Sequence, residues 1–451
     1  MDLFGTAGIR GPVDADVTPD RALAVGRAAG RDGGTFVVGY DGRVTSPALA
    51  DAVASGLASA GADVVKLGRV PTPALAYASQ GRRGVMVTAS HNPPTDNGIK
   101  LFVDGEEYHG DAERRLEDRV ANNTHPVSWD QWRATEREDV LPYYRDAVAT
   151  YAHTLGAAPT DLTVAVDCGN GMAGVATPHV LRALGASVIA TEANVDGHFP
   201  ARESKPTAES LTALRSLVAS MDADVGIGHD GDGDRLVLVD EEGDVVHEDT
   251  VVAMLAETYT AGSSAEDPVV VTTPNASGRI DQRVEEAGGR VERVRLGALH
   301  EGIADVRADA GPDTEVVFAA EPWKHVHPAF GGWIDAVASA AVLARLFAAT
   351  PLAERRAVVD ERPYRKVSVP CPETAKAGAM ETLGESLPAA FPEATVSTDH
   401  GVRLSFDGGA WALVRPSGTE PYVRVYAESE SVDDLIDQVE SLVRSAVDDA
   451  N

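Results

Sequence analysis

Segment 88–100 of this 451-residue chain directly follows an apolar run and contains residues that could carry out phosphoryl or acyl transfer. Ser90 is followed at once by His91, and Lys100 comes ten residues later. A serine hydroxyl is a weak nucleophile that needs a base or a metal ion to activate it. Ser90 is therefore either an activated nucleophile or the cap of a turn broken by the Asn-Pro-Pro that follows. A serine hydrolase is disfavoured because no G-x-S-x-G sequence surrounds Ser90.

Three aspartates alternate with glycines at Asp230, Asp232 and Asp234. This spacing lets three carboxylates converge on one hard cation. A calcium-binding EF-hand loop has a similar alternation, but its sixth position needs Gly, and here that position is Arg235. The flanking sequence is also that of strands rather than helices. Three carboxylates leave coordination positions for a phosphate oxygen, which favours Mg²⁺ over a closed Ca²⁺ cage; a solvated acidic turn is the alternative.

A third polar segment lies near the C-terminus, where Arg415 precedes Ser417, Gly418 and Thr419, and Arg424 follows on the next predicted strand. Gly418 exposes backbone N–H groups, the hydroxyls add donors, and Arg415 can hold a phosphate through two parallel hydrogen bonds. The segment predicts a phosphate site, with a plain hairpin turn as the alternative. A glycine-rich segment at residues 4–11 ends near Arg10 and is a weaker indication of an anion site.

Composition limits the classes of partner. The net charge is −31, from 70 acidic and 39 basic residues, and only six of the basic residues are lysines. Such a surface repels nucleic acid and anionic lipid, so neither is an expected partner, and it favours adaptation to high salt. Two distant cysteines, no apolar run long enough to span a membrane and no secretory signal favour a cytoplasmic protein.

The chain contains a weak threefold repeat of strand, turn, amphipathic helix and strand, at 36–67, 163–191 and 268–296. Each copy is followed by one more apolar strand that runs into a polar loop. Because ligands gather at the carboxyl ends of strands in open α/β sheets, the three loops are expected to face one cleft. The last segment, with four predicted strands and a helix at 432–447, has an α+β pattern.

The predicted fold class is therefore α/β, with three related mixed α/β domains followed by a small α+β C-terminal domain around a central cleft. The predicted domains are 1–145 with the serine, 146–247 with the aspartates, 248–360 with a third polar loop, and 361–451 with the phosphate segment.

Together these segments resemble the α-D-phosphohexomutase superfamily of archaeal or bacterial type, which includes phosphoglucomutases, phosphomannomutases and phosphoglucosamine mutases. The matching segments occur in the family's order at 4–11, 88–100, 230–235, 321–325 and 415–421, so the resemblance spans nearly the whole chain. The resemblance implies that Ser90 is the phosphoserine and binds one Mg²⁺ together with the three aspartates. It implies further roles around the transferred phosphoryl group for Arg10, His91 and Lys100, with Arg235 beside the metal site.

The resemblance also implies that residues Arg415–Thr419, with Arg424 nearby, hold the non-reacting phosphate of the substrate. The sugar-reading loop departs from the family pattern of Glu-x-Ser-Gly-His, because here it is Glu321-Pro322-Trp323-Lys324-His325. Glu321 and His325 are expected to bind ring hydroxyls. Lys324 is either a substrate-binding residue near a phosphate or an ordinary surface lysine. Trp323 either stacks on the sugar or fills space beneath the loop.

The resulting hypothesis is an intramolecular phosphotransferase that interconverts hexose 1-phosphate and hexose 6-phosphate through a 1,6-bisphosphate, which also serves as activator. Phosphoglucosamine mutase is the first expectation, and phosphoglucomutase or phosphomannomutase is the alternative. A Mg²⁺-dependent sugar phosphatase and a non-catalytic phosphosugar-binding protein are hypotheses from other classes. The expected partner is a phosphosugar, and the expected state is a monomer or a homodimer.

Overall fold

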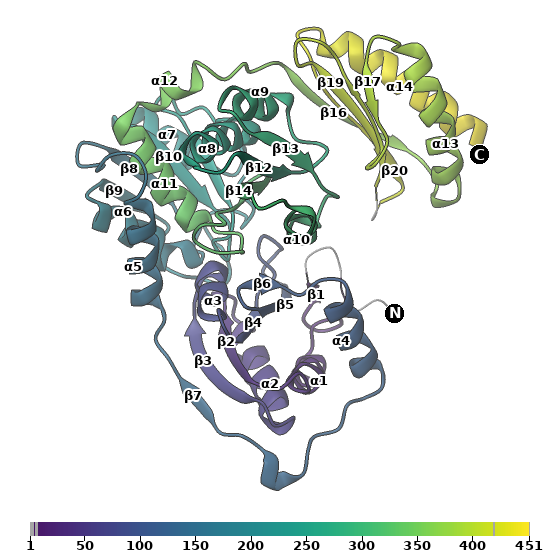
Figure 1. The fold of residues 1–451 in the computed structure, drawn as a ribbon. Coiled ribbons are helices and arrows are strands. Elements are labelled where there is room, and N and C mark those ends of the chain that lie inside the picture. Colours follow the sequence, from purple (N-terminus) through teal and green to yellow (C-terminus); the bar gives the residue numbers. More distant parts are fainter. Residues whose placement is uncertain (1–3, 5–7, 418–419, 451) are drawn as a thin grey trace. The chain divides into compact units, whose positions relative to one another are not determined.

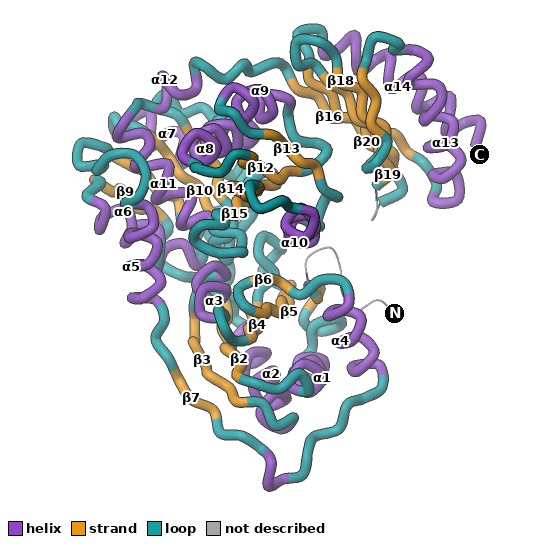
Figure 2. Tube along the Cα trace, viewed as in Figure 1, coloured by secondary structure: helices purple, strands orange, loops and turns teal. Residues whose placement is uncertain are grey.

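The computed structural model describes residue 4, residues 8–417 and residues 420–450. The chain groups into two compact units: a first unit of residues 1–248 and 323–355, and a second unit of residues 249–322 and 356–451. The architecture is mixed α/β, with three α/β sheets and one antiparallel sheet near the C-terminus (Figures 1 and 2). This arrangement confirms the predicted fold class.

The first sheet has the strand order β1-β5-β4-β2-β3-β7, and β6 pairs with β5. Its strands are β1 (Ile9–Pro12), β2 (Thr35–Tyr40), β3 (Asp63–Arg69), β4 (Arg83–Val87), β5 (Asp96–Val103), β6 (Glu106–Glu107) and β7 (Thr135–Arg137). The pairs β2–β3, β2–β4 and β3–β7 are parallel, whereas β5 is antiparallel to both β4 and β1. The antiparallel β4–β5 pair brings Val87 opposite Ile99. The chain therefore reverses direction in the loop between these strands, and this loop carries Ser90.

Helices cover both faces of the first sheet because its strands are apolar on both sides. Phe36 and Val38 pack on one face with helices α1, α2 and α4, whereas Val37 and Met86 pack on the other with α3 and α5. These helices are α1 (Pro19–Gly30), α2 (Ser46–Ser59), α3 (Thr72–Ala78), α4 (Asp111–Ala121) and α5 (Leu141–Ala152). The repeat predicted at 36–67 is the unit β2-α2-β3.

The second sheet, also in the first unit, has the order β11-β10-β8-β9. Its elements are β8 (Thr163–Asp167), α6 (Thr177–Leu184), β9 (Ser187–Thr191), α7 (Thr212–Ser220), β10 (Val225–His229) and β11 (Leu236–Val239). Helix α6 ends at Gly185, whose left-handed φ of 106° closes the helix. Strands β10 and β11 are antiparallel, and the six residues between them are the Asp-Gly segment. Short 3₁₀ turns lie at Trp129–Gln131 and Met172–Val175.

The second unit begins with α8 (Glu248–Gly262) and a parallel arrangement in which β12 lies between β13 and β14. The remaining elements here are β12 (Asp267–Thr272), α9 (Gly278–Glu286), β13 (Arg290–Arg293), α10 (Leu299–Asp309) and β14 (Thr314–Glu321). The chain then returns to the first unit with β15 (Lys324–Val326), α11 (Ala336–Ala349) and α12 (Leu352–Arg356), whose last residue re-enters the second unit.

The C-terminal sheet is antiparallel throughout, with the order β16-β20-β19-β18-β17. Its elements are β16 (Tyr364–Pro370), α13 (Glu373–Ala390), β17 (Thr395–Ser397), β18 (Val402–Ser405), β19 (Trp411–Pro416), β20 (Tyr422–Glu428) and α14 (Val432–Ala450). Helices α13 and α14 pack together on this sheet. Within the second unit, a fully buried ion pair between Arg279 Nη2 and Glu428 Oε1, 2.7 Å apart, joins α9 to β20.

Several details differ from the sequence predictions. The strand expected at 290–296 ends at Arg293, because residues beyond it turn toward α10. The polar loop expected at 319–325 is mostly strand: β14 continues through Glu321, and β15 starts at Lys324. The pattern also missed helix α13, whose residues Gly378, Gly384 and Pro388 weaken a helical signal. None of the described helices is long and apolar enough to cross a membrane.

Candidate active site

Ser90 lies in the loop between β4 and β5 and is 1% exposed. Its backbone φ is +52°, a left-handed conformation that a serine rarely adopts. In this conformation Oγ donates a hydrogen bond to Asp230 Oδ2 at 2.7 Å and lies 3.4 Å from His91 Nδ1. The fold therefore brings together two motifs that are 140 residues apart in sequence.

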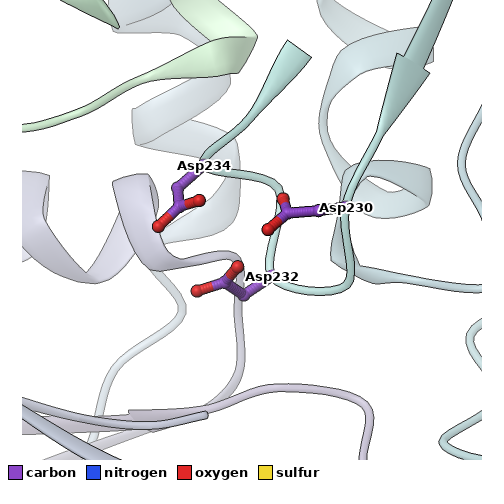
Figure 3. A group of neighbouring side chains, drawn as sticks. All are labelled: Asp230, Asp232 and Asp234. Atoms are coloured by element: carbon purple, nitrogen blue, oxygen red, sulfur yellow. The ribbon is translucent and has the colours of Figure 1, made fainter. Parts of the chain in front are cut away.

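The three aspartates come from the tight turn between β10 and β11, and their carboxylates point toward one another (Figure 3). One oxygen from each lies within 4.8 Å of the others, and all three residues are buried. Burial, followed by the charges of Asp232 and Asp234, raises the pKa of Asp230 well above its usual range. Three buried carboxylates at this separation repel one another unless a cation neutralises them.

Asp232 Oδ1 and Asp234 Oδ1 are buried and have no hydrogen-bond partner. A buried carboxylate oxygen without a donor is costly, and a hard divalent cation is the ligand that removes this cost. The all-oxygen donor set also matches the preference of Mg²⁺. The residues present thus fit a Mg²⁺ ion held by Asp230, Asp232 and Asp234, with Ser90 adjacent.

Two further groups fix the aspartates in place. Lys100, on β5 and 2% exposed, has Nζ 2.9 Å from Asp234 Oδ2 and 3.4 Å from Asp232 Oδ2. Burial opposes the charge on Lys100, but Asp234 and Asp232 outweigh it and raise the pKa of the amine above its usual range. Thr72, at the start of α3, donates its hydroxyl to Asp232 Oδ2 at 2.6 Å. These contacts counteract burial and lower the pKa of Asp232.

Sequence reasoning missed Thr72, although one signal was present. The segment containing Thr72 follows directly on β3, at the carboxyl end of a parallel strand, which is where polar site residues are expected. Its backbone N–H also donates to the carbonyl oxygen of Asp232 at 3.0 Å, so Thr72 contacts both the side chain and the backbone of that aspartate.

The basic residues predicted beside Ser90 and the aspartates also lie there. Arg235 Nε is 3.9 Å from both Asp230 Oδ2 and Asp234 Oδ1. Arg10, on β1, pairs in register with Gly98 of β5. Burial, followed by the charges of Arg235 and Arg10, lowers the pKa of His91 to about 3, so its imidazole is neutral at pH 7.

The Nε atoms of Arg10 and Arg235 are buried without an acceptor. Buried cationic N–H donors that lack a hydrogen-bond acceptor are suited to binding an anion. Together with the neutral imidazole next to Ser90 Oγ, they make the pocket around the serine suited to a phosphoryl group.

The second unit carries the predicted phosphate segment. Arg415 on β19 lies directly opposite Arg424 on β20, and the Nε atom of each is buried without a partner. Like charges paired across two strands are destabilising unless an anion neutralises them. Arg415 also donates to the hydroxyl of Tyr426 at 3.3 Å, and Arg424 pairs with Glu420. Gly418 and Thr419, predicted to complete this site, lie outside the described residues.

Ser417, also predicted here, is 3% exposed, and its backbone N–H donates to the carbonyl oxygen of Tyr422 at 2.9 Å. Lys376, on α13, was not predicted from the sequence; its Nζ donates to the carbonyl oxygens of Ser417 at 2.6 Å and Glu420 at 2.9 Å. The side chain of Lys376 thus links the two ends of this turn, Ser417 and Glu420.

The predicted sugar-reading residues lie in two places. Glu321 ends β14 in the second unit, where its Oε1 accepts a hydrogen bond from the backbone of Gly297 at 2.7 Å. Lys324 and His325 begin β15 in the first unit, and His325 is 1% exposed with Nδ1 3.0 Å from Ser339 Oγ. Trp323, at φ +65°, is partly buried and packs against the core formed by β8, α7 and β11, as the space-filling alternative expects.

Comparison with known proteins assigns the family. Residues 1–126 match phosphoglucomutase/phosphomannomutase alpha/beta/alpha domain I, residues 142–243 match domain II, and residues 367–445 match the C-terminal domain. The chain belongs to the phosphoglucomutase/phosphomannomutase family, within the α-D-phosphohexomutase superfamily, and is an intramolecular phosphotransferase.

Relatives within this family carry more than one name. A protein of Thermococcus kodakarensis named phosphopentomutase is 40% identical, and the match covers 100% of this chain and 99% of that protein. A protein of Methanopyrus kandleri named probable phosphoglucosamine mutase is 38% identical, over 99% of this chain and 98% of that protein. The family is therefore fixed, while the relatives' names divide between pentose and hexosamine phosphates.

Solved structures share the fold. A phosphoglucomutase/phosphomannomutase family protein from Burkholderia thailandensis superimposes with a TM-score of 0.86 at 26% identity, over 100% of this chain and 97% of that chain. An Aspergillus fumigatus N-acetylphosphoglucosamine mutase, solved with GlcNAc-6P and magnesium, has a TM-score of 0.59 at 17% identity, over 99% and 96% of the two chains. At that identity the second likeness concerns the fold alone.

Proposed function

We propose that this chain moves a phosphoryl group between the 1- and 6-positions of a hexose through a phosphorylated Ser90, with glucosamine phosphate as the first candidate substrate. The observation that carries the proposal is the contact of Ser90 Oγ with Asp230 Oδ2, at 2.7 Å, beside the unpartnered oxygens of Asp232 and Asp234. A nucleophile bonded to one member of a cation-binding triplet is the arrangement that phosphoryl transfer needs.

In the first step, the 6-hydroxyl of a hexose 1-phosphate attacks the phosphorus on Ser90 Oγ. The new O6–P bond forms, the Oγ–P bond breaks and leaves its electron pair on Oγ, and the hydroxyl proton passes to a base. The product is the 1,6-bisphosphate. This intermediate reverses its orientation, and Oγ then attacks the phosphorus at position 1. The Oγ–P bond forms, the O1–P bond breaks and leaves its electron pair on O1, O1 takes up a proton, and hexose 6-phosphate is released. A bisphosphate added from outside would serve as activator by phosphorylating Ser90.

The residues around Ser90 have roles consistent with this chemistry. Arg10, Arg235 and Lys100 supply positive charge where the transferred group carries negative charge. The neutral imidazole of His91, 3.4 Å from Oγ, can accept a proton, and bound phosphate would raise its pKa from about 3. Mg²⁺, held by Asp230, Asp232 and Asp234, would supply further charge neutralisation when bound.

The non-reacting phosphate is proposed to bind between Arg415 and Arg424, next to Ser417 and the undescribed Gly418 and Thr419. The buried Nε atoms of Arg415 and Arg424, which have no hydrogen-bond partner, support this assignment. The sugar itself is proposed to contact Glu321, Lys324 and His325. The buried free thiols of Cys168 and Cys371 fit a reducing compartment, which supports the proposal that the enzyme is cytoplasmic.

A pentose phosphate is a second candidate substrate, favoured by the relative named phosphopentomutase that is 40% identical over the whole chain. In that case the acceptor hydroxyl is at position 5 instead of position 6. The sugar-reading loop has Trp323 and Lys324 where the family pattern has two small residues, and this departure is compatible with a change of sugar. Glucose and mannose phosphates remain alternatives to glucosamine phosphate among hexoses.

The test is a mutase assay on matched 1-phosphates of glucosamine, glucose, mannose and ribose, with Mg²⁺ and a small amount of sugar bisphosphate. The assay is run at low and at high KCl, and products are resolved by phosphorus NMR. Formation of the 6-phosphate or 5-phosphate, lost in Ser90→Ala, supports the proposal, and the preferred sugar decides the substrate. Release of free phosphate alone, or full activity in Ser90→Ala, contradicts the proposed mechanism.

A further inference from the structure

A buried arginine lies beneath the Ser90 loop. Arg43 is 1% exposed, and all five N–H donors of its guanidinium have acceptors. One is Asp41 Oδ2, which accepts from Nε at 3.0 Å. The other four acceptors are the main-chain carbonyl oxygens of Ser90 (2.8 Å), Asn92 (2.7 Å), Pro93 (2.5 Å) and Asp96 (3.1 Å). One side chain therefore holds most of the loop that carries the nucleophile.

Asp41 connects this arginine to the other side of Ser90. Its Oδ2 also accepts from the hydroxyl of Thr88 at 2.7 Å, and that hydroxyl accepts from the backbone N–H of Ser90 at 2.9 Å. Its Oδ1 accepts from the hydroxyl of Ser46 at 2.6 Å. Both the N–H and the carbonyl of Ser90 are therefore fixed by the same buried Asp41–Arg43 pair.

Such fixation matters because Ser90 is in an unfavourable conformation. A left-handed φ is unfavourable for a residue with a side chain and persists only where the surroundings hold it. Here the holding contacts are those of Arg43 and Thr88, and the resulting conformation is the one in which Oγ reaches Asp230 Oδ2. Without these contacts, we expect the loop to relax and Oγ to lose its hydrogen bond to Asp230.

The same arrangement recurs in the second sheet. Asp167 is the last residue of β8 and so corresponds to Asp41, which directly follows β2. Asp167 Oδ2 accepts a hydrogen bond from Arg202 Nε at 3.0 Å. Arg202 Nη2 then donates at 2.6 Å to the carbonyl oxygen of His229, the residue directly before Asp230. The guanidinium passes so close to Gly169, at φ +53°, that a Cβ there would lie 2.5 Å from Arg202 Nη2. An Asp–Arg pair thus supports each of the two loops that form the site.

We propose that Arg43, oriented by Asp41, is a positioning residue that holds Ser90 in its left-handed conformation and so directs Oγ at Asp230. Arg202, oriented by Asp167, supports the aspartate loop in the corresponding way. This inference rests on the proposed function of Ser90 and deepens it, because it concerns the geometry of the nucleophile and not the identity of the sugar.

The test compares Arg43→Lys with Arg345→Lys in the full chain. Arg345 is a matched control, because it is buried in the same unit and donates to the carbonyls of Leu155 and Gly156. Two quantities are measured: hydrogen exchange of peptides covering residues 88–97, without any substrate, and kcat and KM on the sugar that wild type turns over. The exchange measurement does not depend on the proposed function.

For Arg43→Lys we expect faster exchange in residues 88–97 and a kcat lowered about 100-fold, the cost of a nucleophile misplaced by an ångström. The KM is expected to change by less than about threefold, since a lost positioning contact acts on the chemical step rather than on ground-state binding. Arg345→Lys is expected to alter neither quantity. Unchanged exchange in residues 88–97, a kcat equal to wild type, or an equal loss in both variants would overturn the proposal.

If Arg43→Lys does not fold, Thr88→Val replaces it, because valine keeps the shape and removes the hydroxyl that links Asp41 to Ser90. The expected results are then faster exchange in residues 88–97 and a kcat lowered about tenfold, and an unaltered kcat refutes the inference. If wild type turns over no sugar phosphate, the proposed function has failed, and the exchange comparison alone decides whether Arg43 holds the loop.

Discussion

Three buried histidines of the first unit are expected to make the stability of that unit fall steeply in acid. Burial lowers the pKa of His229 to about 4. It also lowers the pKa of His325 and of His327 to about 3. The rings are bonded to buried hydroxyls: His229 to Thr177, and the other two to Ser339. In the unfolded chain each imidazole has a pKa of about 6.5.

The sign follows from proton binding. Below pH 6.5 the unfolded chain binds protons that the folded chain does not, so stability is lost as the pH falls from 6.5 toward the folded pKa values. Each histidine costs about 1.4 kcal/mol per pH unit in that range, so by pH 5 the three together cost about 6 kcal/mol. Asp335 has the opposite effect, because burial raises the pKa of its carboxyl group to about 6. The folded chain therefore binds this proton before the unfolded chain does, which stabilises the fold by about 1.4 kcal/mol at pH 5.

For these four groups together the loss is about 4–5 kcal/mol, which is a large share of a typical folding free energy. The assay is denaturant unfolding at fixed ionic strength between pH 8 and pH 5, followed by tryptophan fluorescence. Four of the five tryptophans, Trp129, Trp132, Trp323 and Trp333, belong to the first unit and report on it.

The substitution that tests the reasoning is His229→Gln, which cannot titrate. Its stability should depend on pH less steeply than that of wild type, by about 1.4 kcal/mol per pH unit between pH 6.5 and 4. The exposed His125 is the control, and His125→Gln should keep the wild-type slope. Equal slopes in wild type and His229→Gln would show that the buried imidazole of His229 does not cause the loss of stability in acid.

Three further predictions concern the site and the second unit. Arg415→Ala should raise KM about 10- to 150-fold, the equivalent of the 1.5–3 kcal/mol of a charged hydrogen bond; Arg444→Ala, on an exposed face of α14, should leave KM unchanged. Asp232→Asn should remove a ligand oxygen and weaken Mg²⁺ binding, and a titration calorimetry trace matching wild type would exclude this residue as a ligand. Arg279→Met leaves Glu428 buried and unpaired, so it should lower the unfolding free energy by about 3–5 kcal/mol, visible as a lower denaturant midpoint. An unchanged midpoint would show that the pair is not needed.

Prediction from the sequence succeeded where the signal was local. The three strand-helix-strand units follow from apolar periodicity within about 30 residues, and the structure contains all three, as β2-α2-β3, β8-α6-β9 and β12-α9-β13. The Asp-Gly alternation likewise predicted converging carboxylates, and the three side chains lie together. Helix α13 was missed because its glycines and proline hide a helix that packing against α14 stabilises.

Local sequence patterns were thus sufficient to predict the fold class and the chemical groups of the site, because strand and helix periods and short motifs are encoded by neighbouring residues. The contacts that hold those groups in place become visible only in the folded chain. Thr72 contacts Asp232 across 160 residues and Lys100 contacts Asp234 across 134. Arg43 and Lys376 act on loops far from them in the chain. Such roles arise from burial and pairing between distant segments, where each buried charge must find partners, and no local pattern records which partners these are.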